Sequence, residues 1–161
     1  MRNVDIYTDG AARGNPGNGG YGALLLFVDG EGRTHEKELS GGFENTTNNR
    51  MELLGVIEAL EHLKFPCKVT IHSDSKYVCD AFNQHWVDSW LKRGWKGANR
   101  KPVKNVDLWK RLLAAKEGHE CSFVWVKGHA GDEYNERVDS LATTAADSDD
   151  LSIDEGYIEE G

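Results

Sequence analysis

The sequence has few cysteines and prolines and no long hydrophobic run, and each shortage excludes a class of protein. Its three cysteines, Cys67, Cys79 and Cys121, are odd in number and show no C-x-x-C spacing, so they support neither a disulfide framework nor a cysteine zinc site. We interpret all three as buried or half-buried thiols. No apolar run approaches the roughly 18 residues of a membrane span, and residues 1–5 lack the apolar segment of a signal peptide. We therefore expect a cytoplasmic protein without a membrane partner.

Length and composition indicate a single globular unit. The 161 residues are 39% hydrophobic and 29% charged, with 18 glycines against three prolines, which is typical of an ordinary soluble domain and not of a disordered or fibrous chain. A chain of this length buries a core without disulfides or a structural metal. We expect it to be a monomer.

The net charge of -8 is distributed unevenly along the chain. Residues 147–161 contain seven acids and no lysine or arginine, which leaves 19 bases and 20 acids in residues 1–146. We predict that residues 1–146 form the folded domain and that 147–161 form an acidic, flexible tail. Docking of the tail against the domain is the alternative, because it also contains the apolar residues Leu151, Ile153, Tyr157 and Ile158.

One segment of the domain is basic and rich in tryptophan. Residues 86–109 carry six bases against two acids, Asp88 and Asp107. The bases are Lys92, Arg93, Lys96, Arg100, Lys101 and Lys104, and the tryptophans are Trp86, Trp90, Trp95 and Trp109. Positive charge interleaved with aromatic rings predicts a surface that follows a phosphate backbone. For Trp86, Trp90 and Trp109 the alternative is a place in the core of a helix.

The hydrophobic pattern changes from strand to helix after residue 43. Short runs over 4–8, 21–28 and 35–43 predict three strands with no helix between them, and hence an antiparallel meander. From residue 49, apolar residues recur at helical spacing up to a stop at Phe65-Pro66. The remaining pattern predicts strands over 68–72 and 122–126 and helices over 75–82, 106–116 and 133–146. This order predicts an α/β fold in which helices cover both faces of a mixed sheet.

Four carboxylates lie where a merely solvated acid would be out of place. Asp9 and Asp74 each end a predicted strand, whereas Glu52 and Asp139 lie on or beside the apolar stripe of a predicted helix. Plainer alternatives exist, since Asp74 fits a helix cap and Asn49-x-x-Glu52 fits a capping box. If the four acids met without a counter-charge, each pair at about 4 Å would repel by roughly 4 kcal/mol. Such a cluster therefore predicts hard divalent cations, and oxygen ligands favour Mg²⁺ or Mn²⁺.

Short motifs spread along the chain carry a resemblance to a known family. They are Asp9-Gly10, Gly14-Asn15-Pro16-Gly17, Gly20-Tyr21-Gly22, Thr47-Asn48-Asn49-Arg50-Met51-Glu52, Ser73-Asp74-Ser75, Gly128-His129-Ala130-Gly131 and Asn135-Glu136-Arg137 ahead of Asp139. In this order, over about residues 3–146, the sequence resembles ribonuclease H of type 1 and is close to its bacterial members. The resemblance implies a ribonuclease H-like fold with a five-stranded mixed sheet, the first three strands antiparallel. Residues 1–146 would be the catalytic domain, with 86–109 as the family's basic protrusion.

The same resemblance implies an activity. Members of this family are endonucleases that hydrolyse the RNA strand of RNA/DNA hybrids, leaving 5'-phosphate and 3'-hydroxyl ends. Asp9, Glu52, Asp74 and Asp139 match the family's metal ligands, which would hold two Mg²⁺ or Mn²⁺ ions per site with substrate bound. His129 matches a mobile-loop histidine that shuttles protons or helps product release. Two other classes stay open: a hybrid-binding module, which would normally lack one carboxylate, and another nuclease or integrase, which should lack the histidine loop and the protrusion.

Substrate contacts are implied in the same way. Amides both donate and accept, which suits them to detect a 2'-hydroxyl, and the candidates are Asn15, Asn48 and Asn49. Thr47 and Asn105 would hold a phosphate of the DNA strand. The protrusion would follow the DNA backbone through Trp86, Trp90, Lys92, Arg93, Lys96, Lys101 and Lys104.

Lys76 is a departure from the family pattern, because many bacterial relatives have glutamine there. A lysine so close to Asp74 would either contact a phosphate or lower the affinity for metal. We predict that Lys76 belongs to the substrate-binding set.

Overall fold

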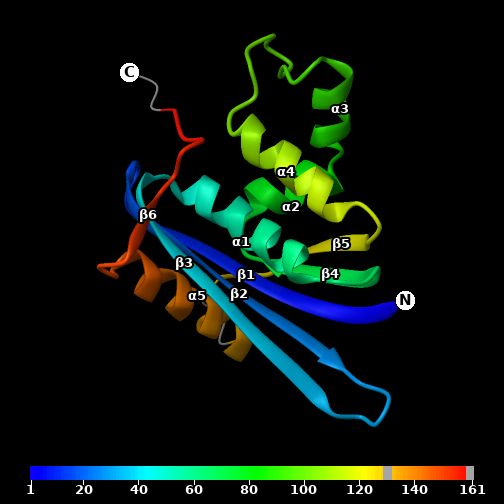
Figure 1. Ribbon diagram of the computed structural model, residues 1–161. Helices are drawn as coiled ribbons and strands as arrows, with labels where there is room; N and C mark the ends of the chain where they lie inside the picture. The colour runs from blue at the N-terminus through cyan, green and yellow to red at the C-terminus, as the bar shows by residue number, and fades with distance from the viewer. Residues whose placement is uncertain (129–131, 159–161) are drawn as a thin grey trace.

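The computed structural model describes residues 1–128 and 132–158, which form a mixed sheet covered by helices on both faces (Figure 1). The strands, in the spatial order β5-β4-β1-β2-β3-β6, are β1 Arg2–Gly14, β2 Gly17–Val28, β3 Thr34–Thr46, β4 Cys67–Ser73, β5 Glu120–Trp125 and β6 Leu151–Ile153. The helices are α1 Asn48–His62, α2 Lys76–Asn83, α3 Trp86–Lys92, α4 Val106–Lys116 and α5 Glu133–Ala146. The predicted α/β class is confirmed. Among the described residues, no helix has the length and apolar character needed to cross a membrane.

Strands β1, β2 and β3 form the predicted antiparallel meander, but each is longer than its hydrophobic run. The pairing of β1 with β2 continues from Asp5 opposite Leu26 to Gly14 opposite Gly17. Gly14 has φ +113°, a backbone conformation that residues other than glycine rarely adopt. The strands continue beyond their apolar runs because strand pairing uses backbone groups, which glycine supplies as well as any other residue.

In residues 1–128 and 132–158 the sheet has six strands, one more than the five implied by the resemblance. The additional strand, β6, runs parallel to β3, with Leu151 opposite Gly42. It belongs to the acidic segment expected to be flexible, and it covers part of the edge of β3 that would otherwise stay unpaired. Three residues are too few to show an alternating pattern, so the strand depends on its partner more than on its own sequence.

Helices cover both faces of the sheet, as predicted. Helix α1 packs on β1 and β2, α4 packs on α1, and α5 packs against β1, β2 and β3 from the opposite face (Figure 1). Glycines permit the approach of α5, because a Cβ on Gly20 or Gly22 would collide with the backbone of Ala142 or Val138. This close packing brings Asp139 of α5 near the middle of β1.

Residues 86–109 form a protrusion that stands away from the sheet (Figure 1). It begins with α3, a helix that the hydrophobic pattern does not predict, and it ends in the first turn of α4. Trp109 is fully buried, and the partly buried Trp90 packs edge-on against it with ring centroids 5.2 Å apart. Trp86 is exposed. The tryptophans therefore divide between supporting the protrusion and facing solvent.

Candidate active site

Three acidic side chains from separate elements converge beside the carboxyl end of β4. Asp9 lies in β1, Glu52 near the start of α1, and Asp74 directly after β4. One carboxylate oxygen of each lies within 4.8 Å of the other two. Asp9 and Glu52 are buried, and Asp74 is half-buried. This is the clustering that the positions of these acids in the sequence predict.

The backbone explains the convergence. Strands β1 and β4 are parallel with Thr8 in register with Ser73, so the next residues, Asp9 within β1 and Asp74 just after β4, lie at the same level. Gly10 allows α1 to approach, because a Cβ there would collide with the backbone nitrogen of Glu52.

The plainer roles of these acids do not hold in the structure. Thr47 caps α1 by accepting from the Arg50 N–H, and Ser75 caps α2 by accepting from the Val78 N–H. Glu52 therefore does not take part in the cap of α1, and Asp74 is not the cap of α2.

The cluster is too buried and too close for all three groups to be charged without a cation. Burial, followed by the charge of Asp74, raises the pKa of Asp9 to about 7. Burial also raises the pKa of Glu52, and the charges of Asp9 and Asp74 add to that effect. The Gly10 backbone N–H donates to Asp9 Oδ1 at 2.9 Å and acts in the opposite direction on the pKa of Asp9. The site therefore favours positive charge.

Two further observations fit a divalent cation. Glu52 Oε2 is buried and has no hydrogen-bond partner in the described part of the chain, and a buried carboxylate oxygen in that state costs free energy unless it meets a donor or a cation. Asp139 of α5 lies close enough to Asp9 to raise its pKa, a smaller effect than burial and the charge of Asp74. The group within 4.8 Å consists of Asp9, Glu52 and Asp74, and all its donors are oxygens suited to Mg²⁺ or Mn²⁺.

The segment around Asp74 is held by a tryptophan that no motif indicates. Trp125 Nε1 donates to the Asp74 backbone carbonyl at 3.1 Å, and the Lys76 ammonium lies 4.8 Å from the centroid of the Trp125 ring. A Cβ on Gly128 would lie 2.9 Å from Asp74 Oδ2, so this glycine also packs against the site. The predicted loop histidine, His129, lies outside the described residues.

A second group of predicted residues lines an open cavity of about 710 Å³ at the start of α1. The predicted substrate-binding residues on its wall are Asn15, Thr47, Asn49, Lys104 and Asn105. Asn48 lies next to them, because its backbone N–H donates to Asn15 Oδ1 at 3.2 Å. The residues proposed for the RNA strand and for the DNA strand therefore neighbour one another.

Behind this cavity lies a buried arginine whose role is missed from the sequence. The Arg50 guanidinium donates to both carboxylate oxygens of Asp107, at 2.9 and 2.7 Å, and to both of Asp154, at 2.7 and 2.9 Å. A longer contact of 3.3 Å reaches Asn105 Oδ1. Burial alone would lower the pKa of Arg50, but the two carboxylates outweigh it and raise that pKa. No spacing signal indicates this network, because its members come from three distant parts of the chain.

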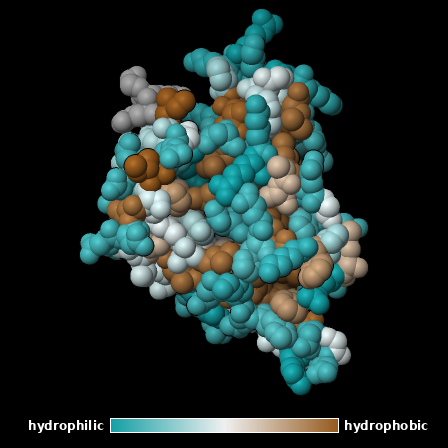
Figure 2. Space-filling view, in the orientation of Figure 1, coloured by the Kyte–Doolittle hydropathy of each residue, from teal (hydrophilic) through white to brown (hydrophobic). Residues whose placement is uncertain are grey.

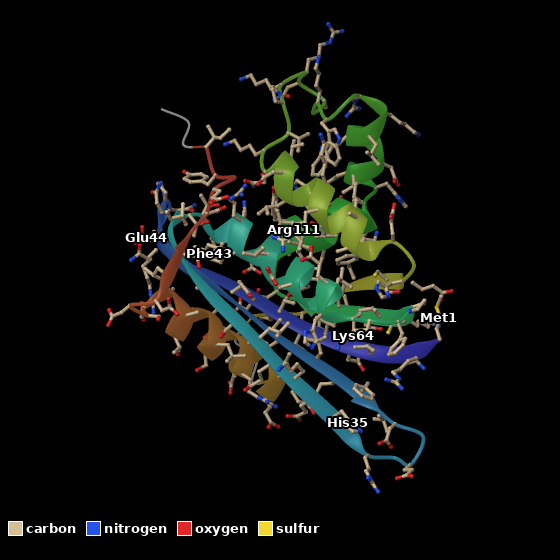
Figure 3. The ribbon with its side chains drawn as sticks, viewed as in Figure 1. Met1, His35, Phe43, Glu44, Lys64 and Arg111 are labelled. Atoms are coloured by element: carbon tan, nitrogen blue, oxygen red, sulfur yellow. The ribbon has the colours of Figure 1, made fainter. Side chains whose placement is uncertain are left out.

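The basic residues of the protrusion are all exposed. They are Lys92, Arg93, Lys96, Arg100, Lys101 and Lys104. The outer end of the protrusion is hydrophilic in the space-filling view (Figure 2), and long side chains extend from it into solvent (Figure 3). This geometry suits contact with an extended polyanion.

Comparison with known proteins gives consistent matches over nearly the whole chain. The family model RNase H matches residues 1–147. Ribonuclease H of Lachnoclostridium phytofermentans is 61% identical over 152 residues, which is 94% of this chain and 96% of the relative. Ribonuclease H of Novosphingobium aromaticivorans is 57% identical over 146 residues, 91% of this chain and 98% of the relative.

Solved structures agree with the sequence relatives. LC9-RNase H1, a type 1 RNase H with the type 2 active-site motif, matches with a TM-score of 0.81 and 35% identity over 91% of this chain and 72% of its own. LC11-RNase H1, solved in complex with RNA/DNA hybrid, matches with a TM-score of 0.63 and 26% identity over 89% of this chain and 96% of its own.

The fold, the carboxylate cluster and these matches define a nuclease, which is a hydrolase of phosphodiester bonds. Within that class, the chain belongs to the ribonuclease H family. The resemblance seen in the sequence motifs is thereby confirmed, as is the prediction that the protein is an enzyme.

Proposed function

We propose that the protein is an endonuclease that cuts the RNA strand of RNA/DNA hybrids with the help of two divalent cations, Mg²⁺ or Mn²⁺. The observation that carries the proposal is the convergence of Asp9, Glu52 and Asp74, with carboxylate oxygens within 4.8 Å of one another. Membership of the ribonuclease H family supports the substrate class, as does the RNA/DNA hybrid bound to LC11-RNase H1.

The residues of the cluster would hold the cations and shape the reaction. Asp9, Glu52, Asp74 and Asp139 supply only oxygen donors, so they select hard cations and leave softer metals without their preferred ligands. Divalent cations bound there supply Lewis-acid chemistry, activating water and stabilising charge on the leaving oxygen. Without them, the carboxylates would repel the substrate phosphate. We propose that cleavage leaves 5'-phosphate and 3'-hydroxyl ends, and that His129 assists proton transfer or product release.

Recognition of the hybrid needs groups that distinguish its two strands. We propose that Asn15, Asn48 and Asn49 detect the 2'-hydroxyl of the RNA strand. Because Asn15 Oδ1 already accepts from the Asn48 backbone, the Asn15 amide presents its NH₂ group to the substrate. Thr47 and Asn105 would bind a phosphate of the DNA strand in the adjoining cavity.

A cleavage assay on matched substrates tests this function. The protein should cut the RNA strand of a hybrid in the presence of Mg²⁺ or Mn²⁺, leave duplex RNA and duplex DNA of the same sequence intact, and lose all activity in a chelator. We expect a monomer, so the rate per chain should not depend on protein concentration. Cleavage of duplex DNA would indicate another nuclease on the same fold, and binding without cleavage would indicate a hybrid-binding module.

Neutralising the protrusion should weaken hybrid binding and flatten its salt dependence. The test variant replaces all six exposed bases by glutamine. Each phosphate contact that is lost should reduce the slope of log K against log salt concentration by somewhat under one. Trp86 and Trp90 are left unchanged in this variant, so the change in slope reports the bases alone. A control variant replaces four exposed bases away from the protrusion, Arg33, Lys37, Lys64 and Lys68, by glutamine and should keep the wild-type slope. An unchanged slope in the test variant would show that the phosphates lie elsewhere.

Replacing His129 by Ala should lower kcat by about ten- to a thousandfold, with a smaller change in KM. General acid-base groups contribute about 10² to 10⁴ to rate, and water bypasses a proton shuttle in part. Steady-state kinetics from pH 6 to 9 measure the effect. A kcat that matches the wild type over this range would remove His129 from the mechanism.

A further inference from the structure

The C-terminal segment, residues 147–158, is attached to the domain at three points. Asp147 pairs with Arg13 at 2.7 Å, β6 pairs with β3, and Asp154 binds Arg50. The first contact is between exposed side chains, whereas the Asp154 and Arg50 side chains are only 11% and 2% exposed. Beyond the third attachment, the chain forms part of the wall of the cavity through Gly156, Tyr157 and Ile158.

Asp154 is tied into the domain by more than its ion pair. Besides both oxygens bonding Arg50, its Oδ2 accepts from the hydroxyl of Thr46 at 2.7 Å, and Thr46 is fully buried at the end of β3. The next residue, Thr47, caps α1. Asp154 thus connects Arg50 to the end of β3, next to Thr47, which lines the cavity.

Arg50 in turn determines the orientation of the Asn105 amide. A guanidinium is only a donor, so the group of Asn105 that faces Arg50 Nη1 at 3.3 Å must be the oxygen. The Asn105 NH₂ group then points the other way, where one of its hydrogens meets the Tyr77 hydroxyl at 3.1 Å. Its second hydrogen is left for a ligand in the cavity. A phosphate oxygen is only an acceptor, so this orientation is the one that binds it.

We propose that Asp154 is a positioning residue for the DNA strand: by holding Arg50, it keeps the Asn105 amide turned with its NH₂ group toward the phosphate. This inference rests on the proposed function. It assigns the C-terminal segment a part in substrate binding, although the segment itself is acidic.

A purely electrostatic role for the segment predicts the opposite result. The five acids of residues 147–158 would repel a polyanion bound nearby, so removing one negative charge would tighten binding at low salt and have little effect at high salt. If Asp154 acts by orientation, removing its charge loosens binding, and the loss persists at high salt because a lost hydrogen bond is not screened.

The test compares Asp154→Asn with Asp147→Asn on the complete chain. Both remove one charge from the same segment, but only the first puts a donor opposite the donors of Arg50. Asp154→Asn should raise KM for the hybrid about three- to tenfold at both low and high salt, with kcat within about twofold of wild type. Asp147→Asn should leave both constants unchanged. An unchanged or lower KM in Asp154→Asn would overturn the proposal.

A double-mutant cycle separates positioning from loss of stability. In an Asn105→Ala background, Asp154→Asn should have no further effect on KM, because the group it orients is gone. Melting curves show whether the variants are folded at the assay temperature; a lower melting temperature with wild-type KM would leave Asp154 a structural residue only and refute its role in binding. Failure of the wild-type protein to cut the hybrid would refute the proposed function. That outcome is separate from the comparison of variants, which tests only the role of Asp154.

Discussion

Replacing Asp9 by Asn should reduce cleavage of the hybrid by about a hundredfold or more, while the fold and hybrid binding remain. A carboxylate oxygen of Asp9 lies within 4.8 Å of one from Glu52 and one from Asp74, so Asp9 contributes a ligand to the cluster that would hold the cations. The substitution removes one charge from the ligand set with almost no change in volume. Turnover and hybrid affinity should be measured in parallel, and residual activity above a few per cent of wild type would exclude Asp9 as an essential ligand.

The same variant should be more stable than wild type when no divalent cation is present. Burial and the charge of Asp74 both disfavour the ionised form of Asp9, so the neutral amide relieves that cost. Added Mg²⁺ should raise the melting temperature of wild type, because it binds the folded state, and should raise that of the variant less. A variant that melts below wild type without cations would contradict this account of the cluster.

Asp5→Asn is the matched control on the same strand. Asp5 is exposed, and its Oδ1 contacts His72 Nε2 at 3.0 Å, away from the cluster by four residues of β1. The chemical change is identical, but no carboxylate cluster is involved. Activity and response to Mg²⁺ should match those of wild type.

The carboxylate cluster could be predicted because local signals mark each of its members. Asp9 and Asp74 come at the ends of short apolar runs, and Glu52 falls on the buried stripe of α1. Parallel pairing of strands and packing of a helix on the sheet then bring such positions together in any fold of this class. The local pattern could not show whether Asp74 and Glu52 serve as helix caps or as metal ligands. The structure excludes the caps, because Thr47 caps α1 and Ser75 caps α2.

The C-terminal contacts could not be predicted because they depend on surfaces formed by distant residues. The sequence does not distinguish Asp154 from the other acids of the segment. What distinguishes Asp154 is its ion pair with Arg50, which is buried by residues from other parts of the chain. Likewise β6 exists only beside the edge of β3. Helix α3 is missed for a different reason: its seven residues span only about two turns, too few for a clear period.

Replacing Arg50 by Met should lower the free energy of unfolding by about 3 kcal/mol. Removing one partner of a buried ion pair leaves an uncompensated charge, which costs roughly 3 to 5 kcal/mol. We expect the lower end, because the Asp107 side chain is 44% exposed and regains water, whereas Asp154 is 11% exposed.

Arg111→Met is the matched control: Arg111 (Figure 3) also binds two carboxylates, Glu58 and Glu61, but with its side chain 40% exposed. An exposed pair contributes about 0 to 1 kcal/mol, so that control should unfold close to wild type.

The stability difference between wild type and Arg50→Met should also narrow in acid. Burial would raise the pKa of Asp107, but the hydrogen bonds and charge of Arg50 outweigh burial and lower it. A carboxyl group whose pKa is lowered by folding stabilises the folded state above its unfolded pKa of about 3.9, and that stabilisation disappears as the pH falls through the folded pKa. The variant lacks this contribution at every pH. Chemical unfolding of both proteins from pH 7 down to pH 3 should therefore show a full difference in the free energy of unfolding at neutral pH, and this difference should shrink below about pH 4. A difference that stays constant over this range would mean that Arg50 stabilises the fold by packing and not through its carboxylate partners.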